Sequence, residues 1–345
     1  MTPQAPATPP PAQERRPRRA PSGAALRYVA RRLGQAVLVM LLVVIGSFIL
    51  IKMAPGDFVD TLAGTSEMTA EQMAALRARY GLDQPVPVQL LYYMARLVTL
   101  DFGMSPLNNA PVIEVIAKRW PVTAILVVAS VSISMVVGTL LGVIAARNQG
   151  RPVDLGLSVL MLAFYATPSF IIAMLLILIF SVRLNVLPIA GFATIGSGYS
   201  GLRYLADVAW HLAMPVTALC TFYIAIYGRI GRAAMLEVLK LDYIRTARGK
   251  GLTERRVVLV HALRNALLPL VTMAGLQVSS LVGGAVLIET IFGLNGMGRT
   301  AFDAVFQRDT NLLLGVVFVS SLSVVVVNFV IDLLYMALDP RVEIR

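Results

Sequence analysis

Long apolar runs alternate with polar segments along the chain. Six runs contain the roughly 20 predominantly apolar residues that an α-helix needs to cross the hydrocarbon core of a bilayer. They lie near residues 33–52, 121–146, 157–182, 212–235, 266–292 and 311–337. Pro215 interrupts the fourth run, which membrane helices tolerate where neighbouring helices satisfy the freed backbone groups. The pattern predicts an all-α polytopic membrane protein of about six transmembrane helices.

The composition agrees with a lipid environment. Of the 345 residues, 57% are hydrophobic and 14% are charged, whereas globular proteins have roughly 25% charged residues. A soluble core of this size cannot bury that much apolar surface. The single cysteine, Cys220, excludes an internal disulfide and a cysteine-cluster metal site. Because no DNA- or RNA-binding motif interrupts the apolar runs, we expect no nucleic-acid partner.

Basic residues are unevenly distributed among the predicted loops. With a cytoplasmic N-terminus, 20 of the 30 Lys and Arg lie in the N-terminal tail, the loops after the second and fourth spans, and the C-terminus. Lys and Arg mark cytoplasmic loops. We therefore expect a multi-pass protein of the plasma (inner) membrane with both termini in the cytoplasm. The net charge of +11 then requires no anionic substrate.

The chain divides into four predicted regions. Residues 1–25 are rich in Pro and Arg, show no apolar periodicity, and are predicted to be a disordered cytoplasmic tail. Residues 26–115 hold the first span and a long external loop. Residues 116–337 form the core transmembrane domain with a cytoplasmic loop at 237–265, and residues 338–345 form a cytoplasmic C-terminus. The first apolar run is longer than a signal-peptide core and lacks an Ala-x-Ala exit, which predicts a retained span.

The external loop, roughly 53–119, contains a predicted short helix. Thr69 and Gln72 have the spacing of a capping box, and Gly81 can end the helix. The segment 83–87, with two prolines, predicts an extended turn after it. Such an ordered segment either packs against the rest of the chain or receives a partner.

The loop at 237–265 carries the clearest functional signal. Its residues at three- and four-residue steps predict one apolar stripe on a helix. The stripe consists of Leu236, Leu239, Tyr243 and Ala247. The segment 249–251 breaks this helix, and Thr253 is expected to cap a second one that runs toward Pro269. The segment is either an interfacial helix on anionic lipid or a docking element that presents a small apolar knob to a cytoplasmic partner.

Several motifs resemble one family. The segment 242–256, Asp-Tyr-Ile-Arg-Thr-Ala-Arg-Gly-Lys-Gly-Leu-Thr-Glu-Arg-Arg, with His-Ala-Leu-Arg-Asn-Ala-Leu-Leu-Pro at 261–269, resembles the coupling loop of binding-protein-dependent ABC importer permeases. Within these it is most similar to the dipeptide/oligopeptide/nickel family. Further similar segments lie at 54–57, 81–85, 101–103, 166–170, 289–293, 296–298 and 338–341. The resemblance covers about residue 26 to the end, and the long external loop is similar to the first (B-type) permease subunit.

One position departs from the wider superfamily pattern, which begins Glu-Ala-Ala with a glycine four residues after the last alanine. This chain has Arg245-Thr246-Ala247 and then Gly251. The alanine and glycine match and the glutamate does not, so no role of that glutamate carries over to this chain.

The resemblance implies an ABC importer type I permease fold and a permease subunit of an ATP-driven importer, with di- or oligopeptides as the solute. Nickel chelates, glycosides or other small solutes are the alternatives. The implied partners are a second homologous permease subunit, two cytoplasmic ATPase subunits or domains, an external solute-binding protein and membrane lipid. The chain lacks a Gly-x-x-x-x-Gly-Lys-[Ser/Thr] loop. We therefore expect ATP and Mg on the ATPase partners, and no catalysis, cofactor or metal on this chain.

The resemblance also implies which residues contact the ATPase. They are Tyr243, Arg245, Thr246, Ala247, Gly251 and Leu252. Gly251 is expected to permit a tight turn, so a β-branched residue there should disrupt docking. Polar residues within or near the fifth span are candidate pathway or gate residues. They are Gln277, Ser279, Ser280 and Glu289.

Two other classes of protein fit the residues less well. A secondary transporter would carry inverted repeats and ionisable groups at the bilayer midplane, and ion dependence without ATPase partners would support it. An intramembrane enzyme needs a nucleophile–base or metal constellation, and turnover by the purified chain alone would support it. We find no convincing repeat, and Cys220, His211 and His261 do not assemble by spacing.

Overall fold

The structure, a computed structural model, describes residues 22–53, 56, 57, 59, 60, 63 and 68–338. The side chains of 22–29, 279–284 and 332–338 also lie outside the described part. Helices dominate the fold, and a single hairpin is present in the described ranges. The elements are α1 (Ser22–Met53), α3 (Ala70–Arg79), α4 (Val86–Val98), β1 (Met104–Ser105), β2 (Ala110–Pro111), α5 (Val112–Arg147), α6 (Pro152–Ala166), α7 (Ser169–Leu176), the π-helix η1 (Ile177–Arg183), α8 (Gly201–Val238), α9 (Asp242–Gly249), α10 (Glu254–Arg256), the π-helix η2 (Val257–Ala262), α11 (Leu263–Gly284), α12 (Val286–Ile291), α13 (Met297–Phe306) and α14 (Thr310–Leu338).

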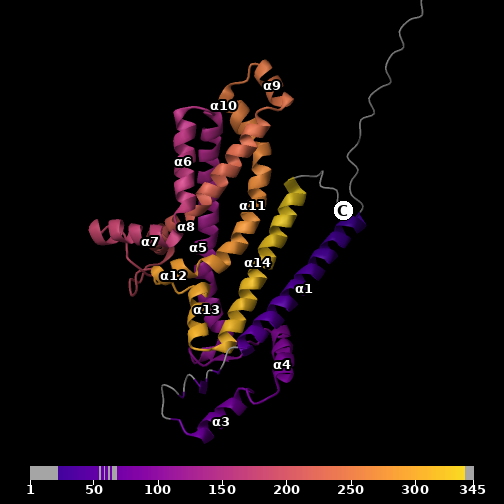
Figure 1. Ribbon diagram of the computed structural model, residues 1–345, viewed down its shortest axis with the longest axis vertical. Helices are drawn as coiled ribbons and strands as arrows, with labels where there is room; N and C mark the ends of the chain where they lie inside the picture. Colours follow the sequence, from indigo (N-terminus) through magenta and orange to yellow (C-terminus); the bar gives the residue numbers. More distant parts are fainter. Residues whose placement is uncertain (1–21, 54–55, 58, 61–62, 64–67, 339–345) are drawn as a thin grey trace, which may run out of the picture.

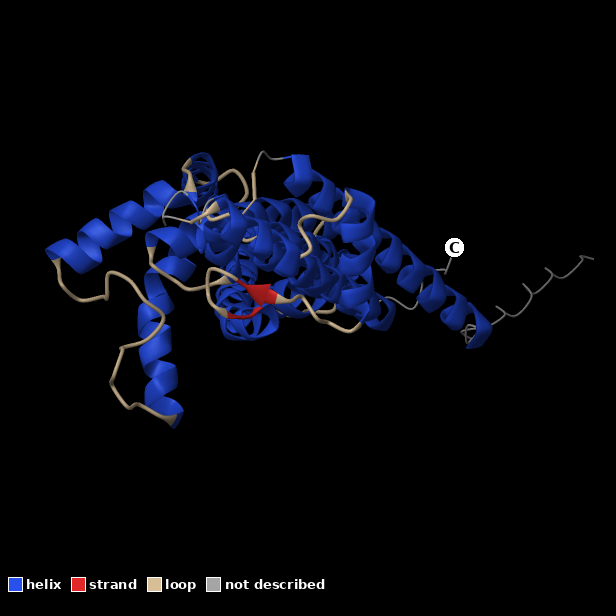
Figure 2. Ribbon diagram, turned by 90° about the horizontal axis from the view of Figure 1, so that it is seen from below, coloured by secondary structure: helices blue, strands red, loops and turns tan. Residues whose placement is uncertain are grey.

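Most of the long helices run along one axis of the molecule (Figure 1). α5 and α8 form the central pair, α6 packs on α8, and α11 lies against both α8 and α14. α1 packs on α14 at the periphery. The helices α9 and α10 lie at one end, together with the start of α1 and the end of α14. The opposite end carries α3 and α13, and Figure 2, seen from that end, shows the hairpin β1–β2 in red.

The prediction of about six spans is confirmed. Among the described residues, five helices are long and apolar enough to cross a membrane, or six if one bent pair counts as a single span. α8 continues through Pro215, as expected for a membrane helix supported by neighbours. α1 begins at Ser22, well before the predicted start of the first span.

The third predicted span, 157–182, is wrong as one straight helix. α6 ends at Ala166, and the α7–η1 segment leaves it at an angle of 97°. Pro168 has no N–H, and its ring disfavours helical backbone at the preceding residue. Thr167 accordingly has extended backbone angles, φ −90° and ψ 120°. The α7 helix therefore projects sideways from the bundle (Figure 1).

The fifth predicted span, 266–292, is wrong as one continuous helix. α11 ends at Gly284, Ala285 forms a turn, and α12 follows as a separate short helix. Two successive glycines at 283–284 favour this end, because glycine loses the most backbone entropy on entering a helix. The boundary predicted near 266 also differs, because the helical segment begins at Glu254 and passes through η2.

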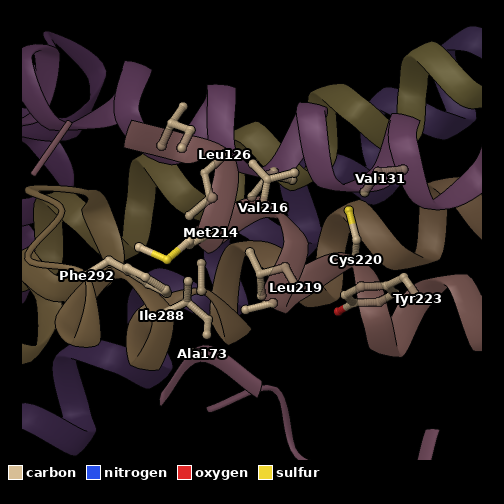
Figure 3. Close-up of a cluster of buried hydrophobic side chains, with 14 of the residues drawn as sticks. Leu126, Val131, Ala173, Met214, Val216, Leu219, Cys220, Tyr223, Ile288 and Phe292 are labelled. Atoms are coloured by element: carbon tan, nitrogen blue, oxygen red, sulfur yellow. The ribbon is translucent and has the colours of Figure 1, made fainter. Parts of the chain in front are cut away.

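The core lies between α5, α8 and the α7 and α12 helices. Figure 3 shows Leu126, Leu219, Ile288 and Phe292 directed toward one another from these elements. Along the α5–α8 contact the two backbones themselves meet. A Cβ atom on Gly142 would lie 2.5 Å from the carbonyl oxygen of Gly228. Only glycine allows this approach, so α5 and α8 pack as one stiff pair.

The short helix predicted within the loop 53–119 is confirmed as α3. The Thr69 hydroxyl accepts from the Gln72 N–H, and the Gln72 side chain accepts from the Thr69 N–H, which makes a capping box. Gly81 has φ +66°, and the N–H of Leu82 donates to the Arg77 carbonyl at 2.9 Å in a Schellman end. The prediction of only an extended turn at 83–87 was incomplete. Pro85 is extended, but α4 begins directly after it.

The segment between α4 and α5 is tied to the last span through Asp309. The Ser105 hydroxyl donates to Asp309 Oδ2 at 2.5 Å, and the N–H of Leu107 donates to the same oxygen. Asp309 Oδ1 accepts from the N–H of Leu312 at 3.0 Å and so caps α14. Burial raises the pKa of the Asp309 carboxyl, and these hydrogen bonds oppose that effect.

Candidate coupling segment and buried carboxylate

The segment 239–262 forms a compact cap at one end of the bundle. α8 ends at Val238, and a turn at 239–241 reverses the chain into the short helix α9. α10 and η2 then lead into α11, so the cap connects α8 to α11 (Figure 1). The sequence analysis expected one helix continuing through residues 236–247, and this expectation was wrong.

The apolar face of α9 points into the chain itself. Ile244 is fully buried and Ala247 is 6% exposed. They join an apolar cluster with residues of α5, α8 and η2, which we call the cap cluster. The cap cluster consists of Val143, Ala146, Met235, Val238, Ile244, Ala247, Val257, Val258, Ala262 and Ala266. Of the predicted stripe, Leu236, Leu239 and Ala247 do lie in or against the cap cluster. Tyr243 was wrong, because it is exposed and Ile244 is the buried residue in its place.

Gly251 forms the turn that ends α9. Its φ is +76°, a left-handed conformation that glycine adopts without strain. The Gly251 N–H donates to the Arg248 carbonyl at 2.9 Å, and the Leu252 N–H donates to the Ala247 carbonyl at 3.4 Å. Leu252 is half-buried against the cap cluster, which completes a Schellman motif with its apolar contact. A side chain at Gly251 would enter open space, so the requirement for glycine is set by the backbone alone.

The exposed face of α9 is polar and mainly basic. Arg245 lies 3.5 Å from Asp242, and both side chains are largely in solvent. Thr246 donates to the Asp242 carbonyl at 3.0 Å. The Glu254 carboxylate receives two hydrogen bonds from Arg248, at 3.1 and 2.8 Å, and raises the pKa of the Arg248 guanidinium. The expected side-chain cap at Thr253 is wrong, because Thr253 occupies the N-cap position without a side-chain hydrogen bond.

Tyr243 connects α9 to the fifth long helix. Its hydroxyl accepts from Asn265 Nδ2 at 2.6 Å and donates to the His261 carbonyl at 3.4 Å. Asn265 lies in the first turn of α11, and His261 lies in η2. The sequence analysis named Tyr243 but missed Asn265. His261 and Asn265 are four residues apart in the motif 261–269, and this helical spacing could have indicated that both lie on the face that Tyr243 contacts.

At the other end of the core, Glu289 is fully buried. Its carboxylate accepts from the Thr123 hydroxyl at 2.6 Å and from the Arg299 N–H at 2.8 Å. The Thr123 oxygen in turn accepts from the Met297 N–H at 2.8 Å. Glu289 therefore serves as the N-terminal cap of α13 while it belongs to α12. A Cβ on Gly296 would collide with this carboxylate, which accounts for the glycine in the segment 296–298.

Of the other candidate pathway residues, one has a described side chain. Gln277 is half-buried on α11. Ser279 and Ser280 fall within the backbone of α11, but their side chains lie outside the described residues. α9 and α12 are well separated along the bundle (Figure 1), so the six coupling-loop candidates and Glu289 form two distinct sites. In the described part of the chain, no group of three or more His, Cys, Asp or Glu is placed to hold a metal ion.

Comparisons with known protein families match nearly the whole chain. Residues 138–344 match the model of the "binding-protein-dependent transport system inner membrane component" family. Residues 25–127 match the model of the N-terminal part of the membrane component of the same systems. The two matches cover the helices that carry both sites described above.

Individual relatives agree with this match. The chain is 37% identical over 335 residues to the dipeptide transport system permease protein DppB of Escherichia coli (strain K12), covering 92% of this chain and 99% of that protein. It is 38% identical over 321 residues to a protein of Brucella suis biovar 1 named as a peptide permease, with the same coverage.

The fold also matches a solved transporter. The MetNI methionine ABC transporter, in an inward-facing conformation, superposes with a TM-score of 0.53 at 18% identity, covering 66% of this chain and 97% of that chain. This likeness concerns the fold, and it confirms the helical importer architecture. Together the family models, the relatives and the fold show that the chain belongs to the family of inner membrane components of binding-protein-dependent ABC transport systems.

Proposed function

We propose that this chain is one of two permease subunits of an ATP-driven importer of di- or oligopeptides. The peptide substrate is supported by the names of relatives that match over nearly their full length. ATP binding and hydrolysis are assigned to two partner ATPase subunits, and delivery of the solute to an external binding protein. The chain itself then supplies half of the pathway and catalyses no reaction.

The observation that carries the docking part of this proposal is the orientation of α9. An interfacial helix holds onto lipid by immersing an apolar face. The apolar face of α9 is already buried in the cap cluster, through Ile244 and Ala247. What α9 presents outward is its polar face, including Arg245 and Thr246. This arrangement favours a protein groove over lipid as the occupant, with the α9 end in the cytoplasm together with both chain termini.

The same geometry corrects the kind of contact expected. One of the two alternatives from the sequence was an apolar knob presented to a partner, but Ala247 and Leu252 pack toward the inside of the chain. Tyr243, Arg245 and Thr246 remain on the exposed face. We therefore assign contact with the ATPase to that face. Gly251 and the buried residues fix its shape.

We further propose that Glu289 supports a gate. It holds the turn between α12 and α13 against α5 through Thr123, at the end of the bundle opposite α9. A carboxylate with this many fixed partners is suited to hold a position in the outer part of the pathway.

The experiment is uptake of labelled di- and oligopeptides by cells that carry the complete transport system, with and without this chain. We expect ATP-dependent uptake that is lost on deletion. Gly251→Val should lower uptake and ATPase association, since valine is strained at φ +76°. Gly249→Val is the matched control, because a Cβ there also meets open space and its backbone is helical.

Two outcomes would contradict the proposal in different ways. Normal peptide uptake in the deletion strain, with no redundant system present, would remove the peptide substrate and favour a nickel chelate or another small solute. ATPase association at the wild-type level in the Gly251→Val variant would remove the docking role of the 242–252 segment and leave the permease architecture unaffected.

A further inference from the structure

The base of α11 is the least regular part of the fifth long helix. It is preceded by the π-helix η2, and π-helical turns are rare and frequently found at functional sites. Pro269 lies one turn into α11 and has no N–H. The carbonyl of Asn265, four residues before it, therefore receives no hydrogen bond from position 269. Asn265 thus lies between two irregular turns, where a helix bends at low cost.

Two kinds of contact join α9 to this base. The first is apolar, between Ile244 and Ala247 on α9 and the cap-cluster residues of η2. Apolar contact is non-directional and allows sliding. The second is the hydrogen bond from Asn265 Nδ2 to Tyr243 Oη at 2.6 Å. A hydrogen bond depends steeply on distance and angle, so this contact fixes the register of α9 against α11.

We propose that Tyr243 and Asn265 form a latch that delivers a displacement of α9 to the base of α11. This inference rests on the proposed function and adds a positioning role inside the chain to the docking role outside it. α9 is joined to α8 through a tight turn of three residues. Toward α11 the chain runs instead through the Gly251 turn and the exposed segment that follows. The latch bypasses that segment and makes both long helices follow α9.

In this arrangement the Tyr243 hydroxyl bonds within this chain and does not contact the ATPase. The hydroxyl is engaged on both sides, with Asn265 as its donor and the His261 carbonyl as its acceptor. The exposed part of the side chain, 38% of the residue, remains available to a partner. Removing the hydroxyl alone should therefore spare assembly and impair the transmission of movement.

The test uses the complete complex reconstituted in liposomes, with spin labels at exposed positions of α11 and α5, Leu276 and Val136. In the wild type, ATP should change the distance between the two labels. Tyr243→Phe and Asn265→Ala should each reduce that change while ATPase subunits still co-purify. Peptide taken up per ATP hydrolysed should fall by about threefold to tenfold, the factor that one lost hydrogen bond gives. The double variant should be no worse than Tyr243→Phe alone, because Tyr243→Phe already removes the contact that Asn265→Ala removes.

Thr272→Val is the matched control. Its hydroxyl also lies on α11 and bonds only the Leu268 carbonyl of its own helix, at 3.1 Å. A full distance change and a normal uptake ratio in Tyr243→Phe would overturn the latch, as would additive effects in the double variant. Loss of ATPase subunits from Tyr243→Phe would also overturn it, because the hydroxyl would then be a partner contact. A wild-type complex whose label distance changes with ATP but which takes up no peptide would contradict the proposed peptide substrate. The label distances in the variants would still test the latch.

Discussion

The Thr123 hydroxyl donates a hydrogen bond to the Glu289 carboxylate across 2.6 Å, although the two residues are 166 positions apart in the chain. The same hydroxyl oxygen accepts from the first N–H of α13. One threonine in α5 therefore holds both a buried carboxyl group and a helix end. Pro121 lies two residues before it, inside the same helix.

Glu289→Gln should destabilise the protein by about 1–3 kcal/mol. The amide can accept from either Thr123 or the Arg299 N–H with its one oxygen, and its NH₂ group then faces the other donor. Gly296→Ala should destabilise the protein as well, because its Cβ meets the carboxylate. Thermal unfolding of the purified protein in detergent measures both effects.

A double variant separates this contact from general disruption. In the Glu289→Ala background the obstacle to a Cβ at Gly296 is gone, so adding Gly296→Ala should cost less than it does in the wild type. Strictly additive losses of stability would show that the carboxylate does not set the requirement for glycine.

Gly142→Ala should lower stability by about 1–3 kcal/mol through overpacking. The new Cβ would lie 2.5 Å from the Gly228 carbonyl oxygen and 2.8 Å from the Arg232 nitrogen, and neither backbone atom can move alone. Gly231→Ala in the same interface is the control, since its nearest neighbour is 3.6 Å away. Equal thermal midpoints for the two variants would contradict backbone contact between α5 and α8.

Asp154→Asn should lower the thermal midpoint clearly. Asp154 on α6 pairs with Arg232 on α8 at 2.7 and 2.8 Å, and only 8% of the aspartate side chain is exposed. Asp154→Asn leaves Arg232, whose side chain is 31% exposed, without the carboxylate that it pairs with. Asp303→Asn breaks an exposed pair with Arg299 at 3.8 Å and should change the midpoint little. The double variant Asp154→Arg with Arg232→Asp exchanges the two charges. A restored thermal midpoint in that protein would support pairing, whereas a further decrease would argue for packing alone.

Asp309 predicts a pH-dependent component of stability. Burial raises the pKa of its carboxyl above the ordinary value. A carboxyl whose pKa is higher in the folded than in the unfolded protein contributes less stability as the pH rises through the folded value. The thermal midpoint of the wild type minus that of Asp309→Asn should therefore shrink from mildly acidic to neutral pH. A difference that grows over this range would have the wrong sign for this group.

The sequence was sufficient where a local rule decides the structure. The lengths of the apolar runs placed the long helices, and the spacing of Thr69, Gln72 and Gly81 placed α3 with its caps. Gly251 was expected to make a turn, and its backbone is left-handed. Each of these features depends on residues within one or two turns of one another.

Prediction from the sequence failed where tertiary contacts determine the structure. Periodicity could not tell that Ile244, rather than Tyr243, would face the cap cluster, because that cluster is assembled from four separate segments. The bend at Thr167–Pro168 needed the backbone effect of proline to outweigh a continuous apolar run. Thr123 and Asn265 were missed because their partners are remote in sequence or lie on another helix.

The inward-facing side chains of α9 bear on the order in which a transporter of this kind assembles. Since Ile244 and Ala247 are buried by the chain itself, the surface that we propose for ATPase docking is already folded in the permease alone. A preformed surface avoids the entropy cost of ordering a loop during association. An ATPase subunit could then leave and be replaced without unfolding the permease, so the encounter rate and not the refolding of the loop would limit how fast a complex is rebuilt.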